Sequence, residues 1–191
     1  MKVVFRPNKK GWIVIGITTL FLLFLKRQKI KSLAMETINY LKEKTWDWRT
    51  DGRIEKLHPS IRSKVKEFII KAEQELGINL RVSSGFRSHS EQNKLYASGR
   101  TESGKIVTHA KAGESYHNYG LAFDVVEIKN GKAIWNNPNW IEIADLGKEL
   151  GFTWGGDWSS FKDKPHFQMN FGKSISQLQQ LYKTDEYVNI V

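Results

Sequence analysis

Two histidines in this sequence stand close to a carboxylate, at spacings that could bring the side chains together. His117 precedes Asp124 by seven residues, and Gly120 lies between them as a place for the chain to turn. Asp163 precedes His166 by three residues, with a proline just before the histidine. A proline disfavours helix at the residue before it. We therefore expect the first pair to converge at a turn, and the second pair to lie where a turn enters a strand.

These side chains have the chemistry of a catalytic zinc site. Such a site uses three protein ligands of nitrogen and oxygen type and leaves a fourth position open. His117, Asp124 and His166 could supply the three ligands. Peptide hydrolysis also needs a base for the attacking water and a positive partner for the oxyanion, for which Asp163 and Arg87 are the candidates. Zinc, rather than another divalent ion, is inferred from the ligand types.

Each of these residues also has a plainer explanation. A histidine near an aspartate is more often a structural hydrogen bond than a metal site. Asp163 could simply begin a turn, and Arg87 could form a surface ion pair. The aromatic segment 152–158 is first a core strand and tight turn, and only second a wall of a substrate cleft. We expect the three other histidines to be structural or exposed: His58, His89 and His109.

Apolar periodicity and turn residues predict the elements that position these side chains. Apolar residues at helical spacing run from Ser60 to Leu76, where Gly77 ends the helix. Ser88 and Glu91 form a capping box that opens a second helix, ending near residue 98. The other predicted elements are a strand at 79–84, a hairpin of 123–129 and 132–135 around an Asn-Gly turn, a helix that closes with residues 145–150 and is ended by a glycine, short strands near residues 152 and 167, and a helix at 176–182. This order predicts an α+β fold, with a small antiparallel sheet flanked by helices.

The positive charge of the chain is concentrated at its N-terminus. The formal net charge is +10, and eight lysines and arginines with no acidic residue lie within residues 1–31. The remainder of the chain is therefore nearly neutral, which argues against a nucleic-acid-binding protein. The absence of cysteine excludes a disulfide framework and a thiolate metal site.

An uncharged apolar stretch, residues 11–25, lies between two basic pairs and predicts an N-terminal hydrophobic helix. Fifteen helical residues reach only about 22 Å, against a hydrocarbon core of about 30 Å. Snorkelling lysines and local thinning of the bilayer could close part of that difference. We favour an uncleaved signal anchor, with a cleaved secretory signal and a buried core helix as alternatives. The basic flanks nearly balance, so they do not determine the orientation.

Several short motifs occur in order between residues 57 and 171. They are Leu57-His58-Pro59, Ser84-Gly85-Phe86-Arg87-Ser88 with Gln92, Tyr96-x-x-Gly99-Arg100-Thr101, Ser115-x-His117-x-x-Gly120-x-Ala122-x-Asp124, Trp154-Gly155-Gly156-Asp157-Trp158 and Asp163-x-Pro165-His166-Phe167. Together they resemble the zinc peptidases of the D-alanyl-D-alanine carboxypeptidase family. The resemblance is greatest to the L-alanyl-D-glutamate endopeptidase branch, which includes phage endolysins and bacterial wall hydrolases.

The resemblance implies a role for each candidate residue. One Zn²⁺ would be bound by His117, Asp124 and His166, with Asp163 as the base and Arg87 steadying the scissile carbonyl. The carboxypeptidase and dipeptidase branches often carry Glu where this chain has Asp163, which favours the endopeptidase branch. The implied fold is that of the hedgehog domain and the D-Ala-D-Ala peptidases. We expect further contacts with the substrate from Ser115, Gln92, Trp154 and Asp157.

The implied organisation has four segments: an anchor at 1–31, a helical spacer at 32–53, the zinc peptidase domain at 54–175, and a C-terminal helix and tail at 176–191. The expected activity is hydrolysis of the L-Ala–D-Glu bond in the stem peptides of peptidoglycan. The alternatives are removal of a terminal D-Ala by the same scaffold, or a non-catalytic wall-binding module. We expect a monomer that binds the cytoplasmic membrane through residues 1–31 and no nucleic acid. Its catalytic domain would lie outside the cytoplasm, or be secreted if the segment is cleaved.

Overall fold

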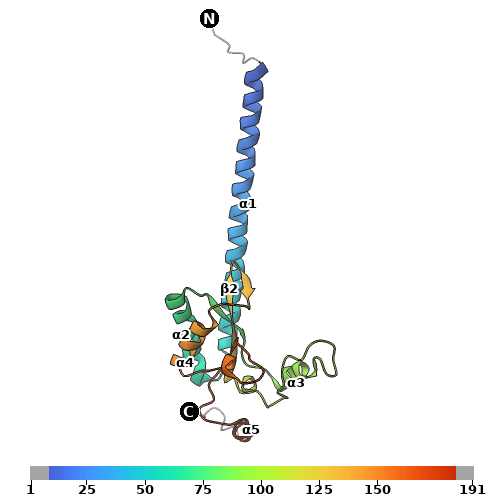
Figure 1. Ribbon diagram of the computed structural model, residues 1–191, viewed down its shortest axis with the longest axis vertical. Helices are drawn as coiled ribbons and strands as arrows, with labels where there is room; N and C mark the ends of the chain where they lie inside the picture. Colours follow the sequence, from blue (N-terminus) through green and yellow to red (C-terminus); the bar gives the residue numbers. More distant parts are fainter. Residues whose placement is uncertain (1–8, 184–191) are drawn as a thin grey trace. The chain divides into compact units, whose positions relative to one another are not determined.

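The computed structural model describes residues 9–183, with side chains from residue 20 onward. Contacts divide the chain into two units, residues 1–42 and 43–191. Helix α1 (Lys9–Ile54) includes the predicted apolar segment and the predicted spacer (Figure 1). The first half of that apolar segment lies outside the described side chains. Within the described part of the chain, no helix contains a stretch both long and apolar enough to cross a membrane. The predicted domain boundaries stay predictions.

The second unit has the predicted α+β architecture. Its sheet has the strand order β1-β2-β5-β4, every pairing is antiparallel, and β3 pairs with the far end of β2. In Figure 1, α2 and α4 lie together beside the sheet, and they contact each other. The elements after α1 are α2 (Pro59–Leu76), β1 (Leu80–Ser84), α3 (His89–Ala97), η1 (Tyr116–Tyr119), β2 (Ala122–Lys129), β3 (Lys132–Ile134), α4 (Trp140–Glu149), β4 (Thr153–Trp154), η2 (Gly155–Asp157), β5 (His166–Gln168) and α5 (Ile175–Lys183).

Three local sequence signals are confirmed. Gly77 ends α2 in the left-handed region at φ 67°, where a residue without Cβ is not strained. The side chain of Ser88 accepts from the backbone of Glu91 at the start of α3, and the glutamate returns a bond to the Ser88 backbone. At the tip of the hairpin, Asn130 and Gly131 have φ of 52° and 69°, as a type I′ turn requires.

Helix α4 begins at Trp140, and the sequence analysis located only its last part, at 145–150. Asn139 is of a residue type that is favoured before a helix, but its side chain makes no cap hydrogen bond here. Burial explains the longer helix, because a helical stripe of apolar residues faces the core from the first turn. The buried residues of this stripe are Trp140, Ile143, Ala144, Leu146 and Gly147.

The core is centred on three phenylalanines from different elements. Phe68 of α2 lies with its ring centroid 4.9 Å from Phe167 of β5 and 6.1 Å from Phe123 of β2, and all three are fully buried. Phe123 and Phe167 are direct partners across the two strands, and so are the next residues, Asp124 and His166. Because side chains alternate along a strand, packing the phenylalanines into the core turns Asp124 and His166 to the other face of the sheet.

The contact between α4 and this core leaves no room for a side chain at Gly147. A Cβ atom there would come 2.5 Å from Cε1 of Phe167, whose ring is held by Phe68 and Phe123. We expect Gly147→Ala to lower the free energy of unfolding by about 1–3 kcal/mol, because overpacking a rigid core forces its neighbours to move. The measurement is chemical denaturation of the full chain.

The matched control is another helical glycine with open space around it. A Cβ atom at Gly52 of α1 would meet nothing within 4 Å. Gly52→Ala should therefore leave the stability unchanged or raise it by up to about 1 kcal/mol, the helix propensity of alanine over glycine. Equal effects of the two substitutions would mean that the contact with Phe167 does not limit the residue at position 147.

Candidate metal centre and its cavity

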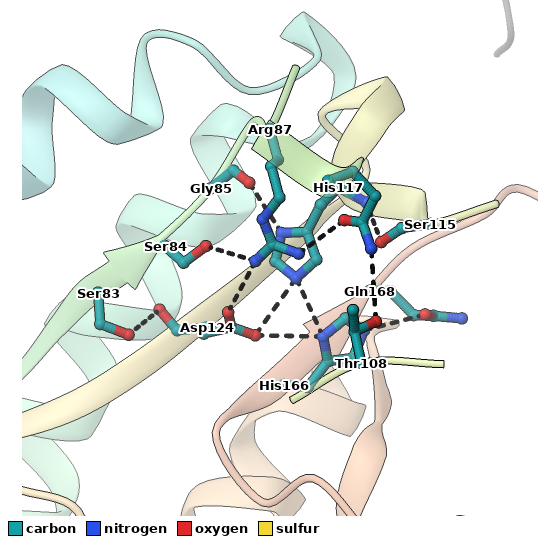
Figure 2. Close-up of polar contacts among 11 residues, drawn as sticks. Ser83, Ser84, Gly85, Arg87, Thr108, Ser115, His117, Asp124, His166 and Gln168 are labelled. Carbon is teal, nitrogen blue, oxygen red and sulfur yellow. Dashed lines mark hydrogen bonds and ion pairs between the residues drawn. The ribbon is translucent and has the colours of Figure 1, made fainter. Parts of the chain in front are cut away.

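Three side chains from three elements meet at one point. Asp124 of β2 and His166 of β5 face each other across the sheet, with 3.1 Å between Oδ1 of the aspartate and Nδ1 of the histidine. His117 of η1 comes from outside the sheet, with its Nε2 at 3.3 Å from Asp124 Oδ1 and 3.2 Å from His166 Nδ1. Figure 2 shows the three side chains pointing toward one another. One ligand atom from each lies within 4.8 Å of the other two.

The turn at Gly120 brings His117 back to the start of β2. Gly120 has φ 64°, and its carbonyl accepts from the backbone N–H of His58 at 2.9 Å. A Cβ atom on Gly120 would lie 2.7 Å from that same nitrogen, so only glycine combines this turn with this close approach. At the other end of η1, the side chain of Ser115 accepts from the backbone N–H of His117 at 3.3 Å.

Outer acceptors determine which nitrogen of each ring carries the proton. His117 Nδ1 lies 2.8 Å from the carbonyl oxygen of Gly85, and His166 Nε2 lies 3.0 Å from Oε1 of Gln168. Both outer nitrogens must donate to these oxygens, so the inner nitrogen of each neutral ring presents a lone pair to Asp124. The lone pairs of the two inner ring nitrogens and of the Asp124 carboxylate then face one another with no proton between them, and a bound cation would balance this arrangement. The group therefore fits a divalent metal, with the outer bonds that metal-binding histidines usually make.

The charges around Asp124 favour its ionised form. Burial by itself would raise the pKa of Asp124, but His117 and His166 outweigh burial and hold that pKa below its usual range. Burial would likewise lower the pKa of His166, but its bond to Asp124 raises it instead. A proton on His166 therefore occupies the place that a metal would take, so the two compete.

Arg87 lies beside the metal-binding group and is held by neutral partners. Its Nη1 donates to Oε1 of Gln92 at 2.9 Å, and its Nη2 donates to Oγ of Ser84 at 3.1 Å. Nη2 also lies 3.8 Å from Oδ2 of Asp124. The backbone of Arg87 is bound as well, because Asn118 donates to its carbonyl at 2.8 Å. The guanidinium is thus fixed in place, with an exposed side-chain fraction of only 17%.

Asp163 lies on the wall of the same cavity. Its backbone N–H donates to the carbonyl of Gly155 and its own carbonyl accepts from His166, which ties the loop before β5 to the site. Burial raises the pKa of Asp163, and the negative charge of Asp124 raises it further, against the opposing influence of His166, His117 and Arg87. A carboxylate whose pKa is raised toward neutrality is better suited to accept a proton.

A cavity of about 680 Å³ contains the metal-binding group, Asp163, Arg87 and Ser115. Trp158 and Phe161 from the loop before β5 form part of its wall, and the Trp158 ring lies 5.0 Å from the ring of His166. His109 also lines the cavity, and its ring packs edge-on against that of Phe161 with 4.8 Å between the ring centroids. The cavity thus combines the polar metal-binding group with aromatic side chains, as binding sites for small molecules and peptides do.

Three predicted substrate contacts lie off this cavity. Gln92 is fully buried, and it holds Arg87 on one side and donates to the carbonyl of Ala110 at 2.7 Å on the other. Trp154 is buried, with its indole N–H donating to the carbonyl of Lys164 at 2.7 Å. Asp157 is exposed and forms an ion pair with Lys148 at 2.7 Å. In these positions the three side chains bind other parts of the protein. Direct contact of the three with the substrate stays a prediction.

Gln168 is a residue of the site that the sequence analysis missed. It lies two residues after His166, so both side chains lie on one face of β5, a signal that could have identified it. We expect Gln168→Leu to weaken metal binding about 10–100-fold, because His166 loses the acceptor that orients its ring. Titration with a metal ion measures this affinity. Gln168→Glu keeps an acceptor and should bind at least as tightly as the unsubstituted chain; equal weakening in both variants would contradict the orienting role.

Comparisons with known proteins agree with this geometry. Residues 108–169, which contain all three metal-binding candidates, match the family described as D-alanyl-D-alanine carboxypeptidase. The chain is 46% identical over 123 residues to the peptidoglycan L-alanyl-D-glutamate endopeptidase CwlK of Bacillus subtilis, covering 59% of this chain and 73% of that protein. It is 28% identical over 126 residues to the L-alanyl-D-glutamate peptidase of Listeria phage A118, covering 64% of this chain and 41% of the phage protein.

A solved structure, the L-Ala D-Glu endopeptidase ChiX of Serratia marcescens, is 28% identical with a TM-score of 0.46, over 64% of this chain and 87% of that one. Because this TM-score is below 0.5, family membership follows from the sequence relatives. With 46% identity over 123 aligned residues, which cover 73% of the Bacillus enzyme, the chain belongs to the D-alanyl-D-alanine carboxypeptidase family of peptidases.

Proposed function

We propose that this chain is a zinc peptidase that hydrolyses the L-Ala–D-Glu bond of peptidoglycan stem peptides. The observation that carries the proposal is the convergence of His117, Asp124 and His166 in one cavity with Asp163 and Arg87. The relatives from Bacillus and from the Listeria phage are named for this activity, which supports the choice of bond.

The chain's own groups account for the proton and the charge in such a hydrolysis. A zinc ion held by His117, Asp124 and His166 would supply Lewis-acid chemistry. The carboxylate of Asp163 accepts the proton of the attacking water and returns it to the leaving amine. The fixed guanidinium of Arg87 stabilises the negative charge that develops on the carbonyl oxygen of the scissile bond. The aromatic side chains of Trp158 and Phe161, which line the cavity, would shield a bound substrate from bulk water and so strengthen these interactions.

An extended binding surface favours an endopeptidase over a carboxypeptidase. An endopeptidase must hold substrate on both sides of the bond that it cleaves, whereas a carboxypeptidase needs a closed pocket for a terminal carboxylate. The cavity of the metal-binding group adjoins a second cavity of about 610 Å³, and Arg87 and Leu95 line both. A substrate chain therefore has room to continue past Arg87.

The test is digestion of purified peptidoglycan by the full-length chain in detergent, with zinc and with a chelator, followed by mass spectrometry. The expected products are zinc-dependent fragments with a new amino terminus at D-Glu. Release of free D-Ala instead would establish the carboxypeptidase activity. No cleavage by the folded, zinc-containing protein would contradict both and leave a wall-binding module.

We also propose that the N-terminal segment anchors the protein to the cytoplasmic membrane, with the peptidase domain on the outer side. Support comes from the run Leu20 to Leu25, six consecutive large apolar side chains that are all exposed on α1. Contiguous apolar surface of this kind marks a membrane or protein contact. A fusion of alkaline phosphatase after Val191 should be active if the C-terminus is exported, and an inactive fusion would contradict export.

A further inference from the structure

The second cavity, next to the site, is lined mainly by cations. Its positive residues are Arg53 at the end of α1, Lys56 in the following turn, Lys94 of α3 and the shared Arg87. Glu91 is the single acidic residue on its wall. The carboxylate of that glutamate is already bound by the backbone N–H and the hydroxyl of Ser88, which hold its pKa below the usual range. The cavity therefore has a clear excess of positive charge.

Three of these four cations are not neutralised by a close carboxylate in the part of the chain that the structure describes. Among the residues that the structure describes, Arg53, Lys56 and Lys94 form no ion pair with a carboxylate. Arg53 is the most buried of the three, and its Nη1 donates to the carbonyl of Val82 at 2.7 Å, which holds the guanidinium in the wall. Burial and the nearby Arg49 lower its pKa, so an anion in the cavity would relieve an unfavourable charge.

The second cavity adjoins the cavity of the metal-binding group. Arg87 and Leu95 line both cavities, and residues 83–87 form part of the wall of the second one. Within that wall, the carbonyl of Gly85 also orients His117, which lines the first cavity. Phe86, 42% exposed, adds apolar surface beside the cations. A ligand that matches this wall carries a carboxylate on a short aliphatic chain.

We propose that this cavity is a subsite for a free carboxylate of the substrate, next to the bond that is cleaved. The proposal rests on the proposed function. In the L-Ala–D-Glu bond the glutamate contributes its amine, and when one of its two carboxyl groups continues the stem peptide, the other one stays free. The subsite would bind this carboxylate through Lys56 and Lys94 at its mouth and Arg53 deeper in the wall. It would therefore select acidic over amidated stem peptides.

The test compares two synthetic peptides that contain the L-Ala–D-Glu bond and differ only in the free carboxyl group of the glutamate, present as the acid or as the carboxamide. The full-length zinc enzyme should show a KM about fivefold lower for the acid, with little change in kcat, as two partly exposed charge pairs predict. The preference should shrink at high salt. In Lys56→Gln/Lys94→Gln the preference should shrink to the part that Arg53 supplies; Arg53 is left unsubstituted because it binds the backbone.

The control variant is Lys129→Gln/Lys132→Gln, which removes two exposed lysines of the β2–β3 hairpin, away from both cavities. This variant should keep the full preference for the acid. Thermal unfolding of both double variants checks that neither has lost its fold. An undiminished preference in Lys56→Gln/Lys94→Gln, or the absence of a preference in the unsubstituted enzyme, would overturn the subsite.

A binding measurement separates failure of the subsite from failure of the proposed function. Calorimetry on Asp163→Asn compares binding of the two peptides without cleavage. Suppose that the unsubstituted enzyme cleaves neither peptide, but Asp163→Asn binds the acid more tightly and this difference depends on Lys56 and Lys94. The subsite is then supported and the proposed activity is contradicted. If both peptides are cleaved and bound equally well, the activity stands and the subsite falls. If neither readout shows a preference, the subsite is overturned.

Discussion

Asp163→Asn should reduce kcat about 10²–10⁴-fold, the range expected when a general base is removed. The amide has nearly the same shape as the carboxylate but cannot accept the proton of the attacking water. The backbone bonds of residue 163, from its N–H to the carbonyl of Gly155 and from His166 to its own carbonyl, do not involve the side chain. We therefore expect the fold and the metal content to be unchanged. The measurements are steady-state kinetics on an L-Ala–D-Glu peptide and metal analysis.

Asp145→Asn is the matched control for this substitution, because Asp145 is exposed on α4 and lies off the cavity. It should leave kcat unchanged. If Asp163→Asn kept full activity with its metal in place, another group would have to act as the base. If its activity fell only in proportion to lost metal, Asp163 would be a residue that supports metal binding.

Removing the guanidinium of Arg87 should have the second largest effect. We expect Arg87→Gln to reduce kcat/KM about 10²–10³-fold, as for the loss of a donor that stabilises an oxyanion. The reason is geometric as well as electrostatic, since Gln92 and Ser84 hold the two terminal nitrogens in fixed positions. Kinetics with the same L-Ala–D-Glu peptide measures this effect.

Arg87→Lys distinguishes charge from geometry. Lysine keeps the positive charge but lacks the planar fork that bonds Gln92 and Ser84 at the same time. We expect it to recover only a small part of the activity lost in Arg87→Gln. Full recovery would show that the charge alone is needed. A parallel loss of metal in both variants would place the role of Arg87 in its 3.8 Å approach to Asp124.

Local elements of the fold were predictable because their causes are local. The capping box of Ser88 and Glu91, the glycine stop at Gly77 and the Asn-Gly turn each depend on residues a few positions apart. The start of α4 has no such local cause, because Asn139 makes no side-chain cap and the buried apolar stripe determines where the helix begins.

For the site, the sequence determined which residue types are present. The order of the motifs indicated that one active site contains His117, Asp124, His166, Asp163 and Arg87. What it could not determine is how these groups are held. The pairing of Asp124 with His166 depends on a strand register across residues 42 positions apart in the chain. That register follows from packing Phe123 and Phe167 against Phe68.

The tertiary structure alone decided the partners that give these side chains their chemistry. The carbonyl of Gly85 orients His117, and buried Gln92 supports Arg87 instead of lining the cavity. The same holds for the cationic cavity, where Arg53, Lys56 and Lys94 come from segments that no motif connects. The physical reason is that motifs record the identity of residues along the chain. Hydrogen-bond partners, burial and the balance of charge arise only where distant segments come together.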